Sequence, residues 1–473
     1  MATRATRIQV QEQVARKNSG NSLLVTVGVG TLFLLFMAFL NVVKSGPLFT
    51  ESNLLFGALI LYAAAAALYI GFGVTGVDRH FQFASGIMIL AWVLNTVAAA
   101  HRWYMSGHPP FASVYEMLLS FVWTLALLTQ FAERKYGVKL IGSVTMPIAV
   151  TSVALMQLLP SEVHPLVPAL QSTWLHVHVT LAMLAYAACA LSFALAMMFL
   201  IKDGLTTETF LAVTSSVSSL IYGALLVTRF TRWGALRVIG WDAARKEEIF
   251  IAKGQRLFVA IPDLGWLFLL TFAAAAAPLV IYIWARVRRQ QDFFVSANRA
   301  VFIAILMQLT AAAAFFLRVQ SGAYPSPDAD GLFATSLAAS PFILAGILSG
   351  IFASILYLML YWRRGDLERA LPSSEVLDRI TYRTIGVAFP LLTLMIAAGA
   401  YWANRTWGSY WSWDPKETWA AITWLVYAGY LHMRITRGWR GRRAAYFAIL
   451  GFAVVMFTFF GVTYLLPGLH AYA

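Results

Sequence analysis

Long apolar runs, separated by short polar segments, follow one another along almost the whole chain. A helix that crosses the hydrocarbon core of a bilayer needs about 20 apolar residues, and by this measure the pattern predicts about 13 transmembrane helices. They are expected near residues 21–43, 53–75, 83–103, 113–132, 139–159, 173–201, 207–228, 258–284, 299–317, 339–362, 382–402, 417–435 and 444–465. The chain is therefore predicted to be an all-α, polytopic integral membrane protein.

Lys and Arg gather in only some of the segments between these runs, and such basic loops usually lie on the cytoplasmic side. The basic segments are the N-terminal tail, 133–135, 286–289, 363–364 and 434–443. By contrast, the loop SGHPPFASV and the C-terminal tail GLHAYA carry no Lys or Arg. We therefore expect the N-terminus in the cytoplasm and the C-terminus on the external side.

The helix at 207–228 is rich in Ser and Thr, and we assign it as a crossing because the later basic loops reach the cytoplasmic side only if it spans the membrane. Without this crossing, Arg286, Arg288 and Arg289 would face outward. With it, the loop 229–256 is external despite seven basic against three acidic residues, and we expect it to carry a small hairpin or surface helix. The basic N-terminal tail shows no small-residue cleavage site, so the first run is predicted to be an anchor helix rather than a signal peptide.

Composition agrees with the membrane assignment and excludes several functions. The chain has 473 residues, of which 60% are hydrophobic and 12% are charged, and this is too apolar for a soluble fold. A net charge of +14 would suit nucleic-acid binding, but the basic residues lie in short loops, so we ascribe the charge to topology. Cys189 is the single cysteine, which excludes an intrachain disulfide and a CxxC thiol reductase.

Tryptophan is concentrated in one segment, 401–432, in the loop at 401–419 and the helix after it. The six indoles are Trp402, Trp407, Trp411, Trp413, Trp419 and Trp424. Asp414 is placed to N-cap the helix, with Pro415 at its first turn and Glu417 to complete a capping box. Aromatic belts at membrane interfaces also collect Trp, but a belt spreads over all helix ends. Crowding in one loop favours a site for a flat aromatic ligand.

Three of the eight histidines are candidates for binding metal. His178 and His470 are expected at the outer surface beside the Trp-rich loop, where two imidazoles could bind a haem iron axially. Either one alone would be better explained as an interface histidine. His432 ends the helix that follows the loop, near the cytoplasmic boundary. It could hold a ligand inside the membrane or be a boundary residue beside Arg434.

The other histidines have simpler explanations. His176 lies about 200° around the helix from His178, so only one of the two should face a shared site. His108 and His164 adjoin prolines in outer loops and are expected to serve turns. His80 and His101 are expected at helix ends, with no assigned function.

These segments resemble one known family. The sequence is similar to CcsA (named ResC or CcsB in some lineages), the haem-handling membrane subunit of the system II cytochrome c synthase. The resemblance rests on RWYMSGHPPFASVYEMLLSFVW (102–123), LVPALQSTWLHVHV (166–179), LDRITYRTIGVAFPLL (377–392), WGSYWSWDPKETWAAITWLVYAGYLHMR (407–434), GWRGRRAA (438–445) and FGVTYLLPGLHAYA (460–473). The Trp-rich part corresponds to the WWD signature of haem-handling proteins.

The resemblance implies roles for particular residues. His178 and His470 match the two external axial haem ligands, and His432 matches the transmembrane histidine that holds haem during its crossing. The residues that match the segment cradling the porphyrin are Trp407, Trp411, Trp413, Asp414 and Trp419. Haem b would then be the substrate, and the metal it brings would be held by these histidines.

The resemblance also implies an organisation. The family core corresponds to 53–202 and 377–473, whereas the tail and first helix (1–52) and a block at 203–376, with its external loop 229–256, have no recognised counterpart. The expected partners are a CcsB/ResB-like membrane subunit, apocytochrome c and haem. The expected location is the cell inner membrane, or the thylakoid membrane in a plastid or cyanobacterium.

The predicted function is cytochrome c biogenesis, with haem presented for covalent attachment to a CxxCH segment as part of a cytochrome c synthase (haem lyase) complex. One alternative is a haem transporter or chaperone without ligation activity. Another is a respiratory subunit with permanent b-type haems, which would require histidine pairs at matching depth within the bilayer.

Overall fold

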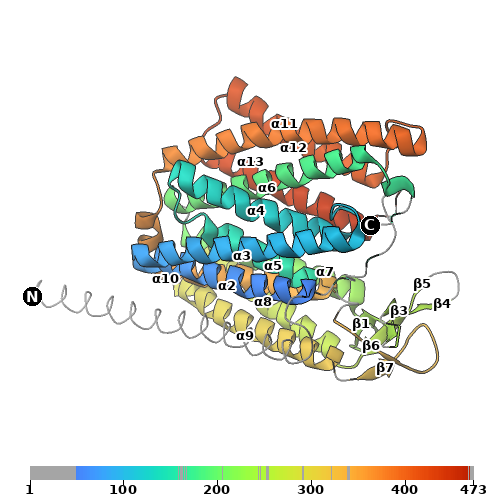
Figure 1. Cartoon of the computed structure of the whole chain (residues 1–473). Helices are drawn as coiled ribbons and strands as arrows, with labels where there is room; N and C mark the ends of the chain where they lie inside the picture. Colours follow the sequence, from blue (N-terminus) through green and yellow to red (C-terminus); the bar gives the residue numbers. More distant parts are fainter. Residues whose placement is uncertain are drawn as a thin grey trace, which may run out of the picture. The chain divides into compact units, whose positions relative to one another are not determined.

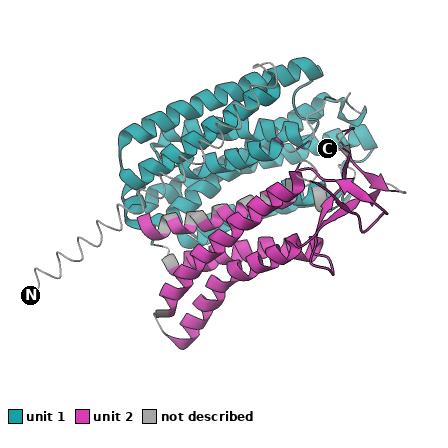
Figure 2. Ribbon diagram, turned by 90° about the horizontal axis from the view of Figure 1, so that it is seen from below, with its two compact units in different colours: residues 1–156, 161–204, 364–473 teal, residues 157–160, 205–363 magenta. Residues whose placement is uncertain are grey.

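The computed structural model describes residues 50–157, 159, 163, 166, 168–204, 206–242, 244–245, 247–251, 255–289, 292–320, 322–337, 341–466 and 468. The predicted helix at 21–43, His164 and His470 lie outside these residues. Two compact units divide the chain (Figure 2): unit 1 comprises 1–156, 161–204 and 364–473, and unit 2 comprises 157–160 and 205–363.

Helices dominate both units. Unit 1 holds α2 (Glu51–Thr75), α3 (Asp78–Ser106), α4 (Val114–Tyr136), α5 (Gly142–Met156), η1 (Pro168–Leu170), α6 (Thr173–Lys202), α11 (Ser374–Trp407), α12 (Pro415–Thr436), α13 (Arg442–Met456), η2 (Phe457–Gly461) and α14 (Val462–Leu465). Within the described residues, nine helices of the chain are long and apolar enough to cross a membrane. The all-α, polytopic membrane fold is confirmed, whereas the total of 13 crossings and their direction stay predictions.

Helix α6 is the central helix of unit 1. It lies against α11, α13 and α4 (Figure 1), and 78% of its most apolar stretch is buried. Small side chains allow this close packing, because in a membrane helices associate through small residues that let the backbones approach. The buried alanines of α6 are Ala182, Ala185, Ala187, Ala188, Ala190, Ala194 and Ala196.

Two glycines end helices of unit 1, one before the loop that leads to α4 and one before the Trp-rich loop. Gly107 follows α3 and Gly408 follows α11, with φ of 74° and 78°. In each case the glycine N–H donates to the carbonyl four residues back, Trp103 or Asn404. Glycine adopts this left-handed conformation without the strain that a Cβ would bring, so both helices stop where the sequence provides it.

The last long helix departs from its predicted form. The pattern predicts one helix at 444–465, but the structure has a π-helical turn, η2, between α13 and α14. Insertions of this kind inside α-helices occur frequently at functional sites. The apolar periodicity does not reveal one, because the residues before and after the turn keep the same composition.

Unit 2 contains α7 (Thr207–Arg229), α8 (Leu264–Arg288), α9 (Asp292–Gln320) and α10 (Pro341–Ala370) as far as Arg363. Its strands form antiparallel pairs. These are β1 (Leu236–Ile239) with β6 (Phe258–Ile261), β2 (Trp241–Asp242) with β3 (Glu247–Glu248), β4 (Phe250–Ile251) with β5 (Gln255–Arg256), and β7 (Ala323–Pro325) with β8 (Leu332–Ala334).

The strands explain a second departure from the sequence prediction. The run predicted as a helix from 258 begins with strand β6, and α8 starts only at Leu264. A short apolar run such as FVAI does not distinguish a strand from a helix by periodicity. Pairing with β1 decides the outcome, because it buries Val238, Val259 and Ile261 in one apolar cluster with Phe268.

Candidate functional site

A cavity of about 150 Å³ lies inside unit 1. It is bounded by α6, α11, the Trp-rich loop, the first turn of α12, the π-helical turn and the loop before α4. Its lining includes Phe111, Ala112, His178, Tyr186, Met395, Gly399, Trp402, Tyr410, Trp411, Lys416, Glu417, Thr458 and Phe459. An apolar, aromatic lining with a few polar groups is the usual composition of a ligand site.

His178 reaches this cavity from α6 in a defined tautomer. Its Nδ1 lies 2.7 Å from the carbonyl oxygen of Met395 on α11. A carbonyl oxygen only accepts hydrogen bonds, so Nδ1 carries the proton and Nε2 carries the lone pair. Histidines that bind metals usually donate their other N–H to a carbonyl or carboxylate in this way. The arrangement therefore suits His178 to metal ligation through Nε2.

The ring of His178 is also confined by its neighbours. It lies nearly parallel to the indole of Trp402, with ring centroids 6.3 Å apart and 20° between the planes. On α11, which also carries Trp402, a Cβ added to Gly399 would come within 2.7 Å of two ring atoms of His178. Only glycine permits this close approach of α11 to the imidazole.

Trp402 and Trp407 form the buried end of the Trp-rich segment. Trp402 is 2% exposed, and its Nε1 donates to the carbonyl of Ala169 at 3.0 Å. Trp407 packs edge-on against Trp402 with centroids 4.9 Å apart. Trp402 lines the cavity, whereas Trp407 is half-buried and lies outside the described lining.

Trp411 and Trp413 occupy the exposed part of the loop. Trp411 lines the cavity, and Trp413 stands at 90° to it with centroids 5.9 Å apart. Trp413 is 76% exposed and has a φ of 60°. A bulky residue rarely adopts this left-handed conformation, so the loop must be held in place by other contacts.

Glu417 provides these contacts. Its Oε2 accepts hydrogen bonds from the backbone N–H of Ser412 at 2.8 Å, the hydroxyl of Ser412 at 3.1 Å and the N–H of Asp414 at 3.3 Å. Asp414 in turn accepts from the N–H of Lys416 at 2.9 Å, and Asp414 and Glu417 together form the predicted capping box. The helix cap and the shape of the Trp-rich loop therefore depend on the same carboxylates.

Two further tryptophans on α12 serve helix packing. Trp419 lies against Phe457 of the π-helical turn, with centroids 4.3 Å apart. Trp424 stacks on Phe389 at 5.3 Å, and its Nε1 donates to Thr393 Oγ1 at 2.8 Å. Neither belongs to the cavity lining that the structure describes.

His432 lies at the other end of α12 with an exposed side chain. It is followed by Arg434, whose guanidinium makes two hydrogen bonds to Asp378, at 2.6 and 2.8 Å. The same carboxylate accepts the N–H of Gly441 at 3.1 Å. His432 is thus next to a tightly bound helix end and is separate from the cavity lined by His178.

Gly468, the last residue that the structure describes, lies beside the start of α12. A small second cavity is lined by Asp414, Pro415, Lys416, Val462, Thr463, Leu466 and Gly468. A Cβ added to Gly468 would meet Asp414 Oδ2 at 2.3 Å. The chain therefore passes directly beside the start of α12 two residues before His470.

The remaining described histidines, unlike His178, are not part of the described cavity lining. His108 donates from Nδ1 to the carbonyl of Pro109 at 2.9 Å, within its own turn. The ring of His176 lies 6.2 Å from that of Phe111, and Nδ1 of His80 lies 2.9 Å from Thr75 Oγ1. Among the described residues, no group of three or more His, Cys, Asp or Glu could hold a metal ion.

Several residues of the site were not predicted from the sequence. Met395 acts through its backbone carbonyl, Gly399 through its lack of a side chain, and Phe459 through a π-helical turn. None of these properties depends on a recognisable residue pattern. Glu417 was predicted only as part of the helix cap, and its hydrogen bonds to the Trp-rich loop were not predicted.

Comparison with known proteins gives a consistent result. Residues 111–240 and 264–470 match the family described as cytochrome c assembly protein. The chain is 30% identical over 424 residues to cytochrome c biogenesis protein CcsA of Pyropia yezoensis, covering 89% of this chain and 95% of the relative. It is 33% identical over 417 residues to the protein of that name from Trichormus variabilis, covering 87% and 94%. For Nostoc punctiforme the figures are 34% over 392 residues, covering 82% and 87%. The family match includes most of 203–376, the block that sequence reasoning left without a counterpart.

Proposed function

This chain belongs to the cytochrome c assembly protein family, and from that membership we propose that it binds haem in the cavity beside His178. It acts in cytochrome c biogenesis as an integral membrane protein. In the proposed reaction it presents haem to the CxxCH segment of an apocytochrome c, for covalent attachment. The observation that carries the proposal is the imidazole of His178, fixed in a metal-binding tautomer in a cavity lined by tryptophan.

The proposed axial ligands of the haem iron are His178 and His470. The hydrogen bond to Met395 orients His178 and raises the basicity of its Nε2. Support for His470 comes from Gly468, which lies against Asp414 beside Lys416, a residue of the cavity lining. Two ligands from distant parts of the chain would hold the iron without any third metal-binding residue.

The aromatic lining would hold the macrocycle itself. Trp402, Trp411 and Tyr410 offer ring contacts, each contributing about 0.5–1.5 kcal/mol beyond the burial of apolar area. Lys416 places a cation in the same lining, where it can pair with a propionate of the haem. We propose that Trp407, Trp413, Trp419 and Asp414 support this cradle from behind or from its rim.

The cavity of about 150 Å³ is smaller than the roughly 300–1,000 Å³ typical of cofactor sites. A whole porphyrin therefore needs the Trp-rich loop to move outward when haem enters. The loop suits such a movement, because its Tyr410 and Trp413 are exposed and three of the hydrogen bonds that shape it go to one carboxylate, that of Glu417.

In the proposed reaction haem is the substrate, and the thiols of the apocytochrome add to its vinyl groups. The histidine of the CxxCH segment replaces one axial ligand of the iron. This chain holds the haem in a fixed orientation and keeps its edge within reach of the peptide, and such positioning is a large source of catalysis. The organic chemistry belongs to the haem and the thiols.

His432 has a different proposed role, in the passage of haem across the membrane. Its exposed side chain at the far end of α12 can meet a ligand from outside this chain. A CcsB/ResB-like subunit is the proposed source of that second ligand. The proposed location of the complex is the cell inner membrane or the thylakoid membrane.

The axial ligands can be tested by absorption spectroscopy of the protein purified with its partner. We expect His178→Ala and His470→Ala each to lose the bis-histidine spectrum of the external haem. His101→Ala, an exposed histidine on α3, serves as the control and should retain it. Unchanged axial ligation in both of the first two variants would refute the proposed site.

Gly399→Ala should weaken the same site without removing a ligand. The new methyl group would lie within 2.7 Å of the His178 ring, so the imidazole must shift and its hydrogen bond to Met395 must lengthen. We expect haem occupancy to fall about tenfold, corresponding to about 1.4 kcal/mol. Gly386→Ala on the same helix, where the added Cβ meets nothing within 4 Å, is the control. Equal occupancy in the two variants would contradict the argument.

A haem transporter without ligation activity is distinguished by its products. Cells that contain only this protein, its partner and a CxxCH substrate should accumulate covalently bound haem if the proposal is correct. Haem that reaches the external side but stays non-covalent would instead support transport alone.

A further inference from the structure

Part of the cavity wall comes from a loop without regular secondary structure. Phe111 and Ala112 line the cavity, and both belong to the loop 107–113 between α3 and α4, which the structure describes throughout. Backbone groups in such a loop must find partners outside a helix or sheet. The position of this wall therefore depends on the side chains that bind its backbone.

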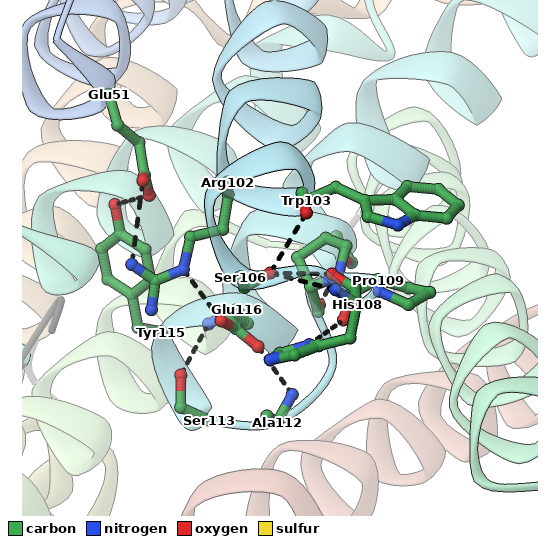
Figure 3. A network of polar contacts seen from close by, with 12 residues as sticks. Glu51, Arg102, Trp103, Ser106, His108, Pro109, Ala112, Ser113, Tyr115 and Glu116 are labelled. Carbon is green, nitrogen blue, oxygen red and sulfur yellow. Dashed lines mark hydrogen bonds and ion pairs between the residues drawn. The ribbon is translucent and has the colours of Figure 1, made fainter. Parts of the chain in front are cut away.

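Glu116, in the first turn of α4, is one such side chain (Figure 3). Its Oε2 accepts the N–H of Ala112 at 2.7 Å, and its Oε1 accepts Nε–H of Arg102 at 2.8 Å. Glu116 and Arg102 are each 2% exposed. A buried carboxylate with a strong donor on each oxygen is fixed in orientation, so the wall at Ala112 is tied to helix α3.

Arg102 is held in turn by two other residues. Its guanidinium lies 3.7 Å from the carboxylate of Glu51 and 5.2 Å from the ring centre of Tyr115. The hydroxyl of Tyr115 donates to Glu51 at 2.7 Å (Figure 3). Through these contacts α2, α3 and α4 share one charged network, and the backbone N–H of Ala112 attaches the cavity wall to it.

We infer that Glu116 and Arg102 are positioning residues for the haem cavity: they fix the Phe111–Ala112 wall and thereby limit access to the haem iron. The inference rests on the proposed function, because it concerns the wall of the same site. On the far side of this wall, Phe111 contacts the ring of His176, two residues before His178 on α6. A displaced wall would therefore loosen the packing on the His178 side of the cavity as well.

Glu116→Gln tests the inference with little change of volume. Both oxygens of Glu116 accept from N–H donors, so the amide nitrogen of Gln must face one of those donors and lose a hydrogen bond. With the haem-loaded complex, we expect cyanide to bind the ferric haem about tenfold faster than in the parent protein. The matched control is Glu133→Gln, a carboxylate on the same helix that is 6% exposed and accepts from Ser85.

A double-mutant cycle separates positioning from general stability. Phe111→Ala should accelerate cyanide binding directly, and combining it with Glu116→Gln should add little, because both changes act through the same wall. Additive effects, or equal acceleration by Glu133→Gln, would overturn the inference. So would a parent-like rate in Glu116→Gln. If that variant fails to accumulate, Arg102→Lys keeps the charge but moves the donor, and the same outcomes apply to it.

The proposed function can fail separately from this inference. A parent protein that binds no haem at the external site would refute the proposed function itself. A parent protein with the His178-dependent spectrum, together with a Glu116→Gln variant of unchanged cyanide kinetics, would refute only the inference about the wall.

Discussion

Replacing Asp378 with alanine is expected to reduce the free energy of unfolding by about 3–5 kcal/mol, the usual loss when one partner of a buried ion pair is removed. Asp378 and Arg434 have side chains only 15% and 10% exposed, and two hydrogen bonds join them. The carboxylate also accepts the N–H of Gly441. Its loss would leave Arg434 with an uncompensated charge and detach the α12–α13 loop from α11.

The measurement is denaturant-induced unfolding of the purified protein in detergent, with Asp203→Ala as the matched control. Asp203 pairs with Arg442 at 2.6 Å, but these side chains are 33% and 53% exposed. Exposed ion pairs contribute about 0–1 kcal/mol, so the control should remain close to the parent protein. Equal losses of unfolding free energy in the two variants would show that burial does not strengthen the Asp378–Arg434 ion pair.

The helices were predictable from the sequence because their cause is local. Each of the predicted transmembrane runs from 53–75 onward overlaps a described helix, since an apolar run of that length meets the needs of a bilayer by itself. Ends were predictable where residue type decides them. Gly107 and Gly408 stop their helices by adopting positive φ, and Asp414 starts α12 as the predicted N-cap.

Elements that depend on a distant partner were not predictable. Strand β6 forms because β1, about twenty residues earlier, pairs with it, as the register Leu236 to Ile261 shows. The π-helical turn at Phe457–Gly461 lies against Trp419 of α12. In both cases the deciding contact comes from another segment, so the local pattern predicts an ordinary helix.

In the candidate site, too, local sequence was informative and the effects of distant contacts were not predictable. Tryptophan density drew attention to the loop, but the sequence could not separate Trp402 and Trp411, which line the cavity, from Trp419 and Trp424, which pack helices. Each of these indoles has the same chemistry. Their roles follow from which side of the segment the neighbouring helix covers, and that depends on tertiary packing.

Replacing Glu417 with alanine is expected to destabilise the ordered form of the Trp-rich loop. Glu417→Ala removes the single oxygen that accepts three hydrogen bonds from Ser412 and Asp414. Hydrogen bonds to a charged group contribute about 1.5–3 kcal/mol each when buried. Ser412 is exposed, so we expect the ordered loop to lose about 2–3 kcal/mol in total. At 1.36 kcal/mol per tenfold change, its population relative to open forms should fall by about 30- to 150-fold.

Covalent haem on a co-expressed CxxCH cytochrome should fall in Glu417→Ala, with that factor as the upper limit of the loss, measured at equal membrane levels of the protein. Glu417→Gln is the matched control, because its amide oxygen can still accept from the same donors. That variant should retain most of the activity, since only the charge is lost. If both variants make as much holocytochrome as the parent protein, the ordered loop is not required for haem attachment. If both lose activity equally, the charge of Glu417 matters rather than its hydrogen bonds to the loop, because Gln keeps the acceptor and Ala does not.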